Sequence, residues 1–209
     1  MIVTVAGNLA QSVKTTLIRG ADLVATPWKN GGGVTREVAA FPDGAGLDAF
    51  VWRVSVADVA QAGPFSRFAG IDRTLALLSG AGMLLDETSA AGEMDTHALT
   101  APLDIARFAG EASIDARLVD GATRDFNLMV RRGAAVGTVE VWRDGTHAVL
   151  SADVVLLFCA SGPIDVTLGE ATQALSLAGN DTLRIDTPNA LSCTIKGAGA
   201  LLAISIRYA

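Results

Sequence analysis

The sequence has 209 residues, of which 50% are hydrophobic, 5% aromatic and 18% charged, with a formal net charge of −6 and a pI of about 4.8. A chain of this length forms one large domain or two small ones, with a core built mostly from Val, Leu, Ile and Ala. The acidic balance disfavours nucleic acid and anionic membranes as partners, because both would repel the chain.

The N-terminal segment shows no targeting signal. The residues before Lys14 include no basic side chain and no convincing cleavage site, so the sequence predicts no signal peptide. The longest apolar run, Val154–Ile164, is well short of the ~20 residues that span a membrane and includes Gly162 and Pro163. We therefore expect a cytoplasmic protein.

The first segment with distinctive polar chemistry is PWKNGGGVTREVA, Pro27–Ala39. Its glycine run matches no phosphate loop, because a P-loop needs Lys-Ser/Thr after its glycines and a dinucleotide fingerprint needs GxGxxG opening a helix. The residues after Gly33 alternate as a strand instead. Glycines permit positive φ and close approach of a ligand or a second strand. The run is either an irregular loop or one that delivers Trp28, Lys29 and Asn30 to a site.

Short strands rich in β-branched residues, separated by glycine-containing turns, follow along the chain. The expected strands are Thr35–Ala40, Phe50–Val56, Thr74–Leu78, Met83–Asp86, Asp125–Arg131, Val136–Val141, Val154–Cys159, Asp165–Leu168 and Leu201–Arg207. Helical periodicity is weak, and a single helical turn is expected within Val56–Ala62. This spacing of strands predicts a sandwich or barrel.

Two pairs of segments resemble each other at a near-constant offset of about 80 residues. LALLSGAGMLLD (Leu75–Asp86) and VLLFCASGPIDV (Val155–Val166) each contain an apolar strand, a small-residue turn and a second strand. LTAPLDIARF (Leu99–Phe108) is echoed by LAGNDTLRID (Leu177–Asp186). The offset favours two copies of one β-unit, arranged as two barrels.

The strand Phe50–Val56 places polar side chains on one face. Trp52 and Val54 share one side, whereas Arg53 and Ser55 share the other. Arg53 is either a solvated residue on an exposed face or lines the interior of a barrel. A buried arginine must be paired or bind an anion.

RDFNLMVRRG, Arg124–Gly133, shows the same pattern. Asp125 and Asn127 share a face with Met129, opposite three apolar residues. Asp and Asn are poor strand formers, so two of them on a buried face need partners. An exposed sheet edge is an equally good interpretation.

Metal, nucleophilic and disulfide chemistry lack a sequence signature. His97 and His147 stand far apart in polar, turn-like segments, so both are expected at the surface, and no metal or other cofactor is expected. No GxSxG motif is present. Cys159 and Cys193 lie in apolar segments and are expected to be buried reduced thiols.

These segments together resemble the HutD/Ves family of bacterial proteins. The resemblance rests on PWKNGGGVTRE (27–37), WRVSVADVAQAGPFSRFAGIDRTLALLSGAG (52–82) and RDFNLMVRRG (124–133), and it extends over essentially the full chain. It implies an all-β, cupin-like fold, an RmlC-like jelly roll that forms a double-stranded β-barrel, with two barrel halves in one chain (a bicupin). The cupin metal signature of two histidines and a glutamate is absent here, as in the family.

The resemblance also implies a division of the chain and a role. We expect an N-terminal cupin-like barrel with the ligand pocket in residues 1–133 and a C-terminal half in residues 134–209 packed against it, with strand exchange between the halves allowed. Family members are proposed to bind a small metabolite of histidine utilisation, such as N-formylglutamate or urocanate, and so to moderate flux. A homodimer is expected by analogy, because sheet edges of such barrels commonly pair.

The polar residues favour a non-catalytic site for a small carboxylate. Arg53 would hold the carboxylate through two parallel hydrogen bonds. The other expected ligand-binding residues are Trp28 and Phe65 as an apolar wall, Lys29, Asn30 and the amides of Gly32 and Gly33 around the anion, and Ser55, Arg73, Asp125 and Asn127 as orienting groups. Thr35 and Glu37 are also expected ligand-binding residues, because Arg36 and Glu37 face opposite ways and parity with Thr35 places Glu37 in the pocket.

Two other functions remain open at this point. The first is a metal-free cupin isomerase or epimerase that uses Lys29, Glu37 or Asp125 for proton transfer, although no histidine is expected in the pocket to support it. The second is a structural or interaction protein whose polar strands only solvate an interface. That alternative predicts no ligand.

Overall fold

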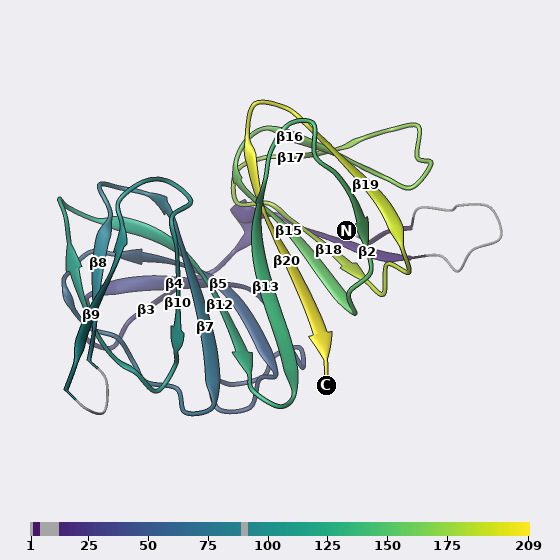
Figure 1. Cartoon of the computed structure of the whole chain (residues 1–209). Coiled ribbons are helices and arrows are strands. Elements are labelled where there is room, and N and C mark those ends of the chain that lie inside the picture. Colours follow the sequence, from purple (N-terminus) through teal and green to yellow (C-terminus); the bar gives the residue numbers. More distant parts are fainter. Residues whose placement is uncertain (1, 5–12, 89–91) are drawn as a thin grey trace. The chain divides into compact units, whose positions relative to one another are not determined.

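The computed structural model describes residues 2–4, 13–88 and 92–209, which form an all-β protein (Figure 1). These residues contain twenty strands and one short 3-10 helix, η1 (Gly20–Asp22). The chain divides into a middle unit, Val24–Ala135, and a terminal unit made of Met1–Leu23 and Val136–Ala209. In the described part of the chain, no helix has the length and apolar character needed to cross a membrane.

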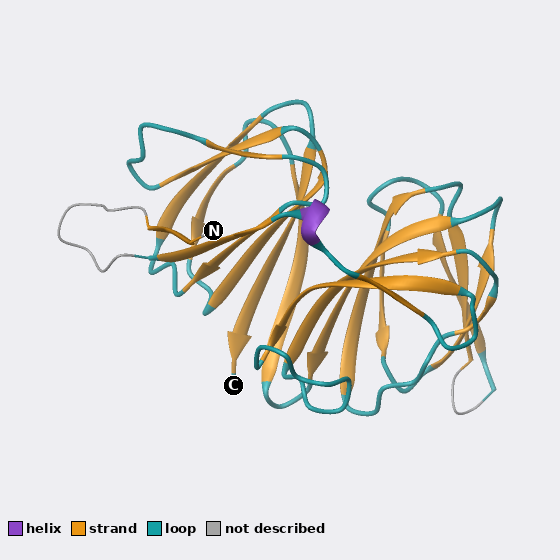
Figure 2. Cartoon of the chain, turned by 180° about the vertical axis from the view of Figure 1, so that it is seen from behind, coloured by secondary structure: helices purple, strands orange, loops and turns teal. Residues whose placement is uncertain are grey.

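The middle unit consists of two antiparallel sheets that lie face to face (Figure 2). The six-stranded sheet has the order β10 (Ile105–Ala109), β7 (Ile71–Ser79), β12 (Thr123–Arg131), β5 (Trp52–Val59), β4 (Gly33–Phe41) and β3 (Ala25–Pro27). The four-stranded sheet has the order β6 (Gly63–Pro64), β11 (Ser113–Leu118), β8 (Met83–Thr88) and β9 (Met94–Leu99).

Alternating side chains of the two sheets form the core of the middle unit. Leu75 and Leu77 of β7 pack in one cluster with Met83 and Leu85 of β8, and all four are fully buried. Side chains at every second position of a strand point to one face, so the two sheets meet through these residues. Each fully buried side chain of this kind contributes about 1.5–3 kcal/mol to folding.

The terminal unit has the same two-layer architecture. Its six-stranded sheet has the order β1 (Ile2–Thr4), β2 (Lys14–Ile18), β18 (Thr182–Asp186), β15 (Val154–Ser161), β20 (Ala200–Tyr208) and β13 (Ala135–Trp142). Its four-stranded sheet has the order β14 (His147–Leu150), β19 (Leu191–Lys196), β16 (Ile164–Leu168) and β17 (Leu175–Leu177).

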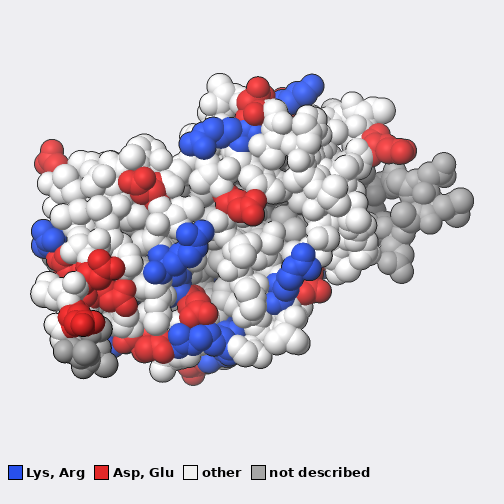
Figure 3. All heavy atoms as spheres, viewed as in Figure 1, with Lys and Arg blue, Asp and Glu red and all other residues white. Residues whose placement is uncertain are grey.

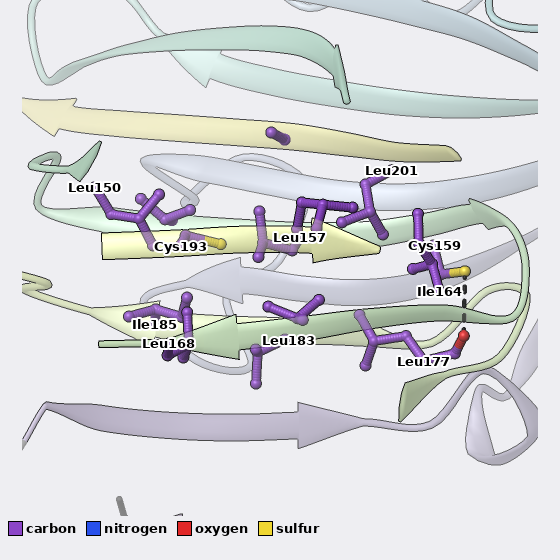
Figure 4. Close-up of a cluster of buried hydrophobic side chains, with 14 of the residues drawn as sticks. Leu150, Leu157, Cys159, Ile164, Leu168, Leu177, Leu183, Ile185, Cys193 and Leu201 are labelled. Carbon is purple, nitrogen blue, oxygen red and sulfur yellow. Dashed lines mark hydrogen bonds between the residues drawn. The ribbon is translucent and has the colours of Figure 1, made fainter. Parts of the chain in front are cut away.

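The core of the terminal unit is apolar and contains both cysteines (Figure 4). Cys159 and Cys193 are buried free thiols, as expected, and Cys159 Sγ lies 3.5 Å from the carbonyl oxygen of Leu177. Burial raises the pKa of both thiols to about 11. They therefore act as small hydrophobic residues and not as nucleophiles.

The two units repeat one order of strands. The order β10-β7-β12-β5 in the middle unit corresponds to β18-β15-β20-β13 in the terminal unit, and β6-β11-β8-β9 corresponds to β14-β19-β16-β17. The segments that echo each other in the sequence, Leu75–Asp86 and Val155–Val166, both cover a strand, a turn and the start of the next strand. The β7–β12 and β15–β20 pairs also share a shift of register.

Every strand expected from the sequence has a counterpart, but two expectations differ from the structure. The helical turn within Val56–Ala62 is wrong, because β5 continues to Val59 with ladders to β4 and β12 on its two sides. The division of the chain also differs at its start, because β2 pairs with β18, with Leu17 opposite Leu183. Such pairing between distant segments leaves no local pattern in the sequence.

Candidate functional site

The six-stranded sheet of the middle unit carries polar side chains on its inner face. Ser55 lies opposite both Glu37 and Asn127, and Met129 lies opposite both Arg53 and Arg73. Residues paired in this way share a face, and it is the face on which Leu75 and Leu77 pack toward the four-stranded sheet. We call these side chains the polar cluster: Glu37, Arg53, Ser55, Arg73, Asp125 and Asn127.

Arg73 is the buried cation of the polar cluster, with 7% of its surface exposed. Its Cζ lies 5.3, 5.8 and 5.1 Å from the ring centres of Phe65, Phe68 and Phe108. One terminal nitrogen is 3.5 Å from the carbonyl oxygen of Ser66, and Nε is buried with no partner among the described residues. Burial lowers the pKa of Arg73 to about 10, against the opposing effect of Asp125. The guanidinium remains charged, and its Nε lacks an acceptor among the described residues.

Asp125 and Asn127 lie next to each other on β12 and are also buried. Asn127 Oδ1 has no hydrogen-bond partner among the described residues. Burial raises the pKa of Asp125 to about 7, although the charge of Arg73 lowers it. Asp125 and Asn127 thus lie on a buried face of the sheet. The exposed sheet edge that the sequence also allowed is not observed for these two residues. A buried polar atom without a partner costs about 1–3 kcal/mol, so the unpartnered Asn127 Oδ1 destabilises the protein when no ligand is bound.

Arg53 is already paired within the polar cluster. Its Nε donates to Glu37 Oε2 at 2.7 Å, and a terminal nitrogen donates to Ser55 Oγ at 3.2 Å. The side chain of Arg53 is 12% exposed and that of Glu37 is 41% exposed, so the pair lies toward solvent. Arg53, Ser55 and Glu37 lie on one face of the sheet, with Glu37 the most exposed of the three. In the described part of the chain, the arginine with a buried nitrogen that lacks a partner is Arg73, not Arg53.

The glycine run forms a tight turn that uses its own amides. The N–H of Gly31, at φ +72°, donates to the Trp28 carbonyl, and the N–H of Gly32 donates to Asn30 Oδ1, each at 3.0 Å. Lys29 and Asn30 are exposed. The expectation that Asn30 and the Gly32 amide surround an anion therefore differs from the structure, where both are bonded to each other.

Gly33 allows the indole of Trp28 to lie over β4. A Cβ at Gly33 would lie 2.4 Å from the carbonyl oxygen of Asp58 and 3.3 Å from the indole ring. Trp28 Nε1 donates to Thr35 Oγ1 at 2.7 Å, and Trp28 packs against the core of the middle unit. Thr35 thus positions an aromatic side chain, and Phe65, which packs on the same core, lies beside Arg73.

The opposite face of the sheet carries a separate ion-pair network. Arg36 and Arg124 donate to Asp58, with nitrogen–oxygen distances of 2.6 and 2.5 Å. The bond from Arg124 is the largest cause of the lowered pKa of Asp58. Arg36 pairs with Val56 in the ladder, and so faces away from the polar cluster, as predicted from its position next to Glu37. All three charges have partners, so this network has a structural role.

The terminal unit is apolar at the position that corresponds to Asp125 of the polar cluster. Leu77 and Leu157 occupy the same place in the two echoed segments, and they pair with Asp125 and Ala203 respectively. Ala203 is buried in an apolar core. The same strand order therefore folds without a buried carboxyl at this position, so the fold does not require Asp125.

His97 is a residue that the sequence analysis misplaced. It was expected at the surface, but its side chain is 23% exposed and its Nε2 lies 2.8 Å from Glu87 Oε2. It pairs with Leu85 in the β8–β9 ladder, which places it on the inner face of the four-stranded sheet. The signal was available in the alternation of His97 with the buried Leu99, two residues later.

The outer surface of the four-stranded sheet is acidic. Acidic side chains gather over β8 and β9 (Figure 3), where Arg117 binds Asp86 at 2.5 Å. In the described part of the chain, no three His, Cys, Asp or Glu side chains come together as a metal site would require.

Residues 20–203 match the model of the HutD family, described as HutD. The chain belongs to the HutD family. It is 40% identical over 174 residues, covering 81% of this chain and 86% of the relative, to an uncharacterized 21.2 kDa protein in the hutC 3′ region of Pseudomonas putida. It is also 36% identical over 136 residues to protein Ves of Citrobacter koseri, covering 65% of this chain and 67% of that protein.

The solved structures similar to this chain agree with the family. HutD from Pseudomonas fluorescens SBW25, described as a formate condition, has a TM-score of 0.78 and 31% identity, covering 93% of this chain and 99% of that one. Oxalate decarboxylase from Bacillus subtilis has a TM-score of 0.64 but only 7% identity, covering 98% and 80% of the two chains, so it shows the fold alone. The chain thus has a cupin-like, all-β fold.

Proposed function

We propose that this chain is a cytoplasmic, non-catalytic protein of the HutD/Ves type that binds a small carboxylate in its middle unit. The observation that carries the proposal is the buried guanidinium of Arg73, whose Nε has no acceptor. A buried charge is strongly unfavourable unless it is paired, and a carboxylate supplies the paired acceptors that a guanidinium binds best. The two units are then the halves of a bicupin, of which only the middle one binds a ligand.

The surroundings of Arg73 support a small ligand. The three phenylalanine rings around its guanidinium exclude water, which strengthens the attraction between the cation and an anion. Asn127 and Asp125 offer further polar atoms on the same face. The pair of Arg53 and Glu37 would fix the shape of the site rather than hold the ligand.

The names of the relatives support a role in histidine utilisation. A relative lies in the hutC 3′ region, and the similar HutD structure is described as a formate condition. Formate is the smallest carboxylate, and a guanidinium with free donors binds it in the same way as a larger acid. In this proposal the protein senses a pathway metabolite such as N-formylglutamate or urocanate and so moderates histidine utilisation.

Calorimetric titration of the purified protein with formate, N-formylglutamate, urocanate and glutamate tests the proposal. Saturable binding to at least one acid is expected, with Arg73→Met abolishing it and Arg53→Ala weakening it less. Arg132→Ala is the matched control, because Arg132 is an ion-paired arginine of the same unit whose side chain is 39% exposed. Flat traces for all four acids, or equal binding by the Arg73→Met variant, would reject the proposal.

The raised pKa of Asp125 favours a second candidate function, a metal-free isomerase or epimerase. Of the three groups considered for proton transfer, Lys29 lies exposed in the turn and Glu37 is bonded to Arg53. Asp125, with a pKa of about 7, is a suitable general base near neutral pH. Incubation of a bound acid in D₂O and detection of deuterium at its α-carbon by NMR would support catalysis. Absence of exchange in every acid that binds would exclude it.

An interaction protein without a ligand remains the alternative to both. It predicts flat titrations together with a stable assembly, so the mass of the protein in solution is measured alongside the calorimetry. The expected homodimer is compatible with all three functions and does not decide between them.

A further inference from the structure

We propose that His97 and Glu87 form the second wall of the ligand site, where His97 accepts a hydrogen bond from the far end of the bound acid. The inference rests on the proposed function and narrows its ligand class. The ligand would be a carboxylate that also carries an N–H or O–H donor. His97 would then favour the binding of such acids over that of carboxylates of the same size that lack a donor.

The position of the pair supports this role. Leu85 and His97 are opposite each other in the β8–β9 ladder, so Glu87, two residues after Leu85, shares their face. That face is apolar and buried at Met83 and Leu99, whereas Asp95, which pairs with Glu87, is exposed. His97 and Glu87 bind each other and are 23% and 27% exposed, so the pair lies where the buried apolar face meets the solvent-accessible part of the unit.

The ring of Phe108 connects this wall to Arg73. Phe108 lies on β10 of the six-stranded sheet, where it pairs with Arg73. Its ring centre is 6.2 Å from that of His97 and 5.1 Å from Arg73 Cζ. One aromatic side chain therefore contacts a cation from one sheet and an imidazole from the other. A ligand bound at Arg73 lies within the same part of the unit as His97.

The hydrogen bond with Glu87 determines what the neutral imidazole offers. A carboxylate only accepts hydrogen bonds, so the proton of the neutral ring is on Nε2, which bonds Glu87 Oε2. Nδ1 then carries a lone pair, and it has no hydrogen-bond partner among the residues that the structure describes. Glu87 is thus a positioning residue, and the acceptor at Nδ1 is available to a donor on the ligand.

A matched pair of probes tests the inference at pH 8. N-formylglutamate has one amide N–H, and N-formyl-N-methylglutamate has a methyl group in its place. Calorimetry should show the N-methyl compound binding the wild type about three- to tenfold more weakly, the effect of one hydrogen bond. In His97→Phe, which keeps an aromatic ring beside Phe108, the ratio of the affinities for the two probes should fall to about one. His97→Asn should restore part of the ratio, because its amide oxygen supplies an acceptor near the position of Nδ1.

The other histidine provides the control. His147 lies exposed on β14 of the terminal unit, so His147→Phe makes the same chemical change away from the site and should leave the ratio unchanged. If the pair of His97 and Glu87 has only a structural role, His97→Phe would change the melting temperature but not the ratio of the two affinities. Equal binding of the two probes by the wild type, or an unchanged ratio in His97→Phe, would overturn the inference and leave carboxylate binding intact. If urocanate, formate and both probes fail to bind the wild type, the proposed function fails with it.

Discussion

The substitution Asp125→Asn should remove a pH-dependent loss of stability. Burial raises the pKa of Asp125 from 3.8 to about 7. The Asp125 carboxyl therefore binds its proton more tightly in the folded protein than in the unfolded chain. Below pH 3.8 the carboxyl is neutral in both states. As the pH rises from there to 7, only the unfolded state releases the proton, and the free energy of unfolding falls. One pH unit corresponds to about 1.4 kcal/mol, so the whole window amounts to on the order of 4 kcal/mol.

Urea unfolding between pH 4 and pH 8, followed by tryptophan fluorescence, measures the effect. The middle unit contains Trp28 and Trp52, which report on its unfolding. The stability of Asp125→Asn relative to the wild type should grow by about 2–4 kcal/mol over this range. Asp120→Asn, an exposed site in the same unit, should follow the wild type. A constant difference, or an Asp125→Asn variant that is less stable at pH 8, would show that Asp125 is ionised and stabilised by Arg73.

Three other substitutions have definite expected outcomes. Arg73→Met should abolish carboxylate binding in calorimetry while the melting temperature stays the same or rises, because a desolvated charge is replaced by an apolar chain; a large fall in melting temperature would contradict this. Gly33→Ala should lower the free energy of unfolding by about 1–3 kcal/mol because of its overlap with a backbone carbonyl, whereas Gly179→Ala, with open space at its Cβ, should change it little. Ala203→Asp should destabilise the terminal unit by about 3–5 kcal/mol in urea, because it buries a carboxyl in an apolar core; an unchanged midpoint would contradict the apolar assignment.

Alternation along each strand was sufficient to predict which side chains share a face. Arg53 and Ser55 lie on one face of β5, and Asp125 and Asn127 lie on one face of β12, as their positions in the sequence require. The period of a strand is a local property, and so it can be read from a single sequence. The strands expected from the sequence were predictable for the same reason, although the end of β5 was wrongly expected to form a helical turn.

Partners across strands could not be predicted in this way. The bond between Glu37 and Arg53 depends on the register of β4 and β5, which shifts between Glu37 and Ala39. The same register pairs Glu37 with Arg53 and leaves Arg73 Nε without an acceptor among the residues that the structure describes. Alternation in the sequence predicts which side chains share a face, whereas the register of the strands determines which charges on that face pair with each other.

If the protein binds a carboxylate at Arg73, as proposed, the buried groups there predict that the carboxylate and a proton bind together. Asp125 and Arg73 interact electrostatically, and burial raises the pKa of Asp125 to about 7. An anion at Arg73 would oppose ionisation of Asp125 further, so the bound state holds the proton more tightly than the free state. Affinity for a carboxylate should therefore fall as the pH rises above about 7, by up to tenfold per pH unit while one proton is taken up. Calorimetry from pH 6 to pH 8 measures the slope, and Asp125→Asn, which cannot ionise, should remove it. A slope that persists in this variant would place the proton on another group and would separate Asp125 from the ligand.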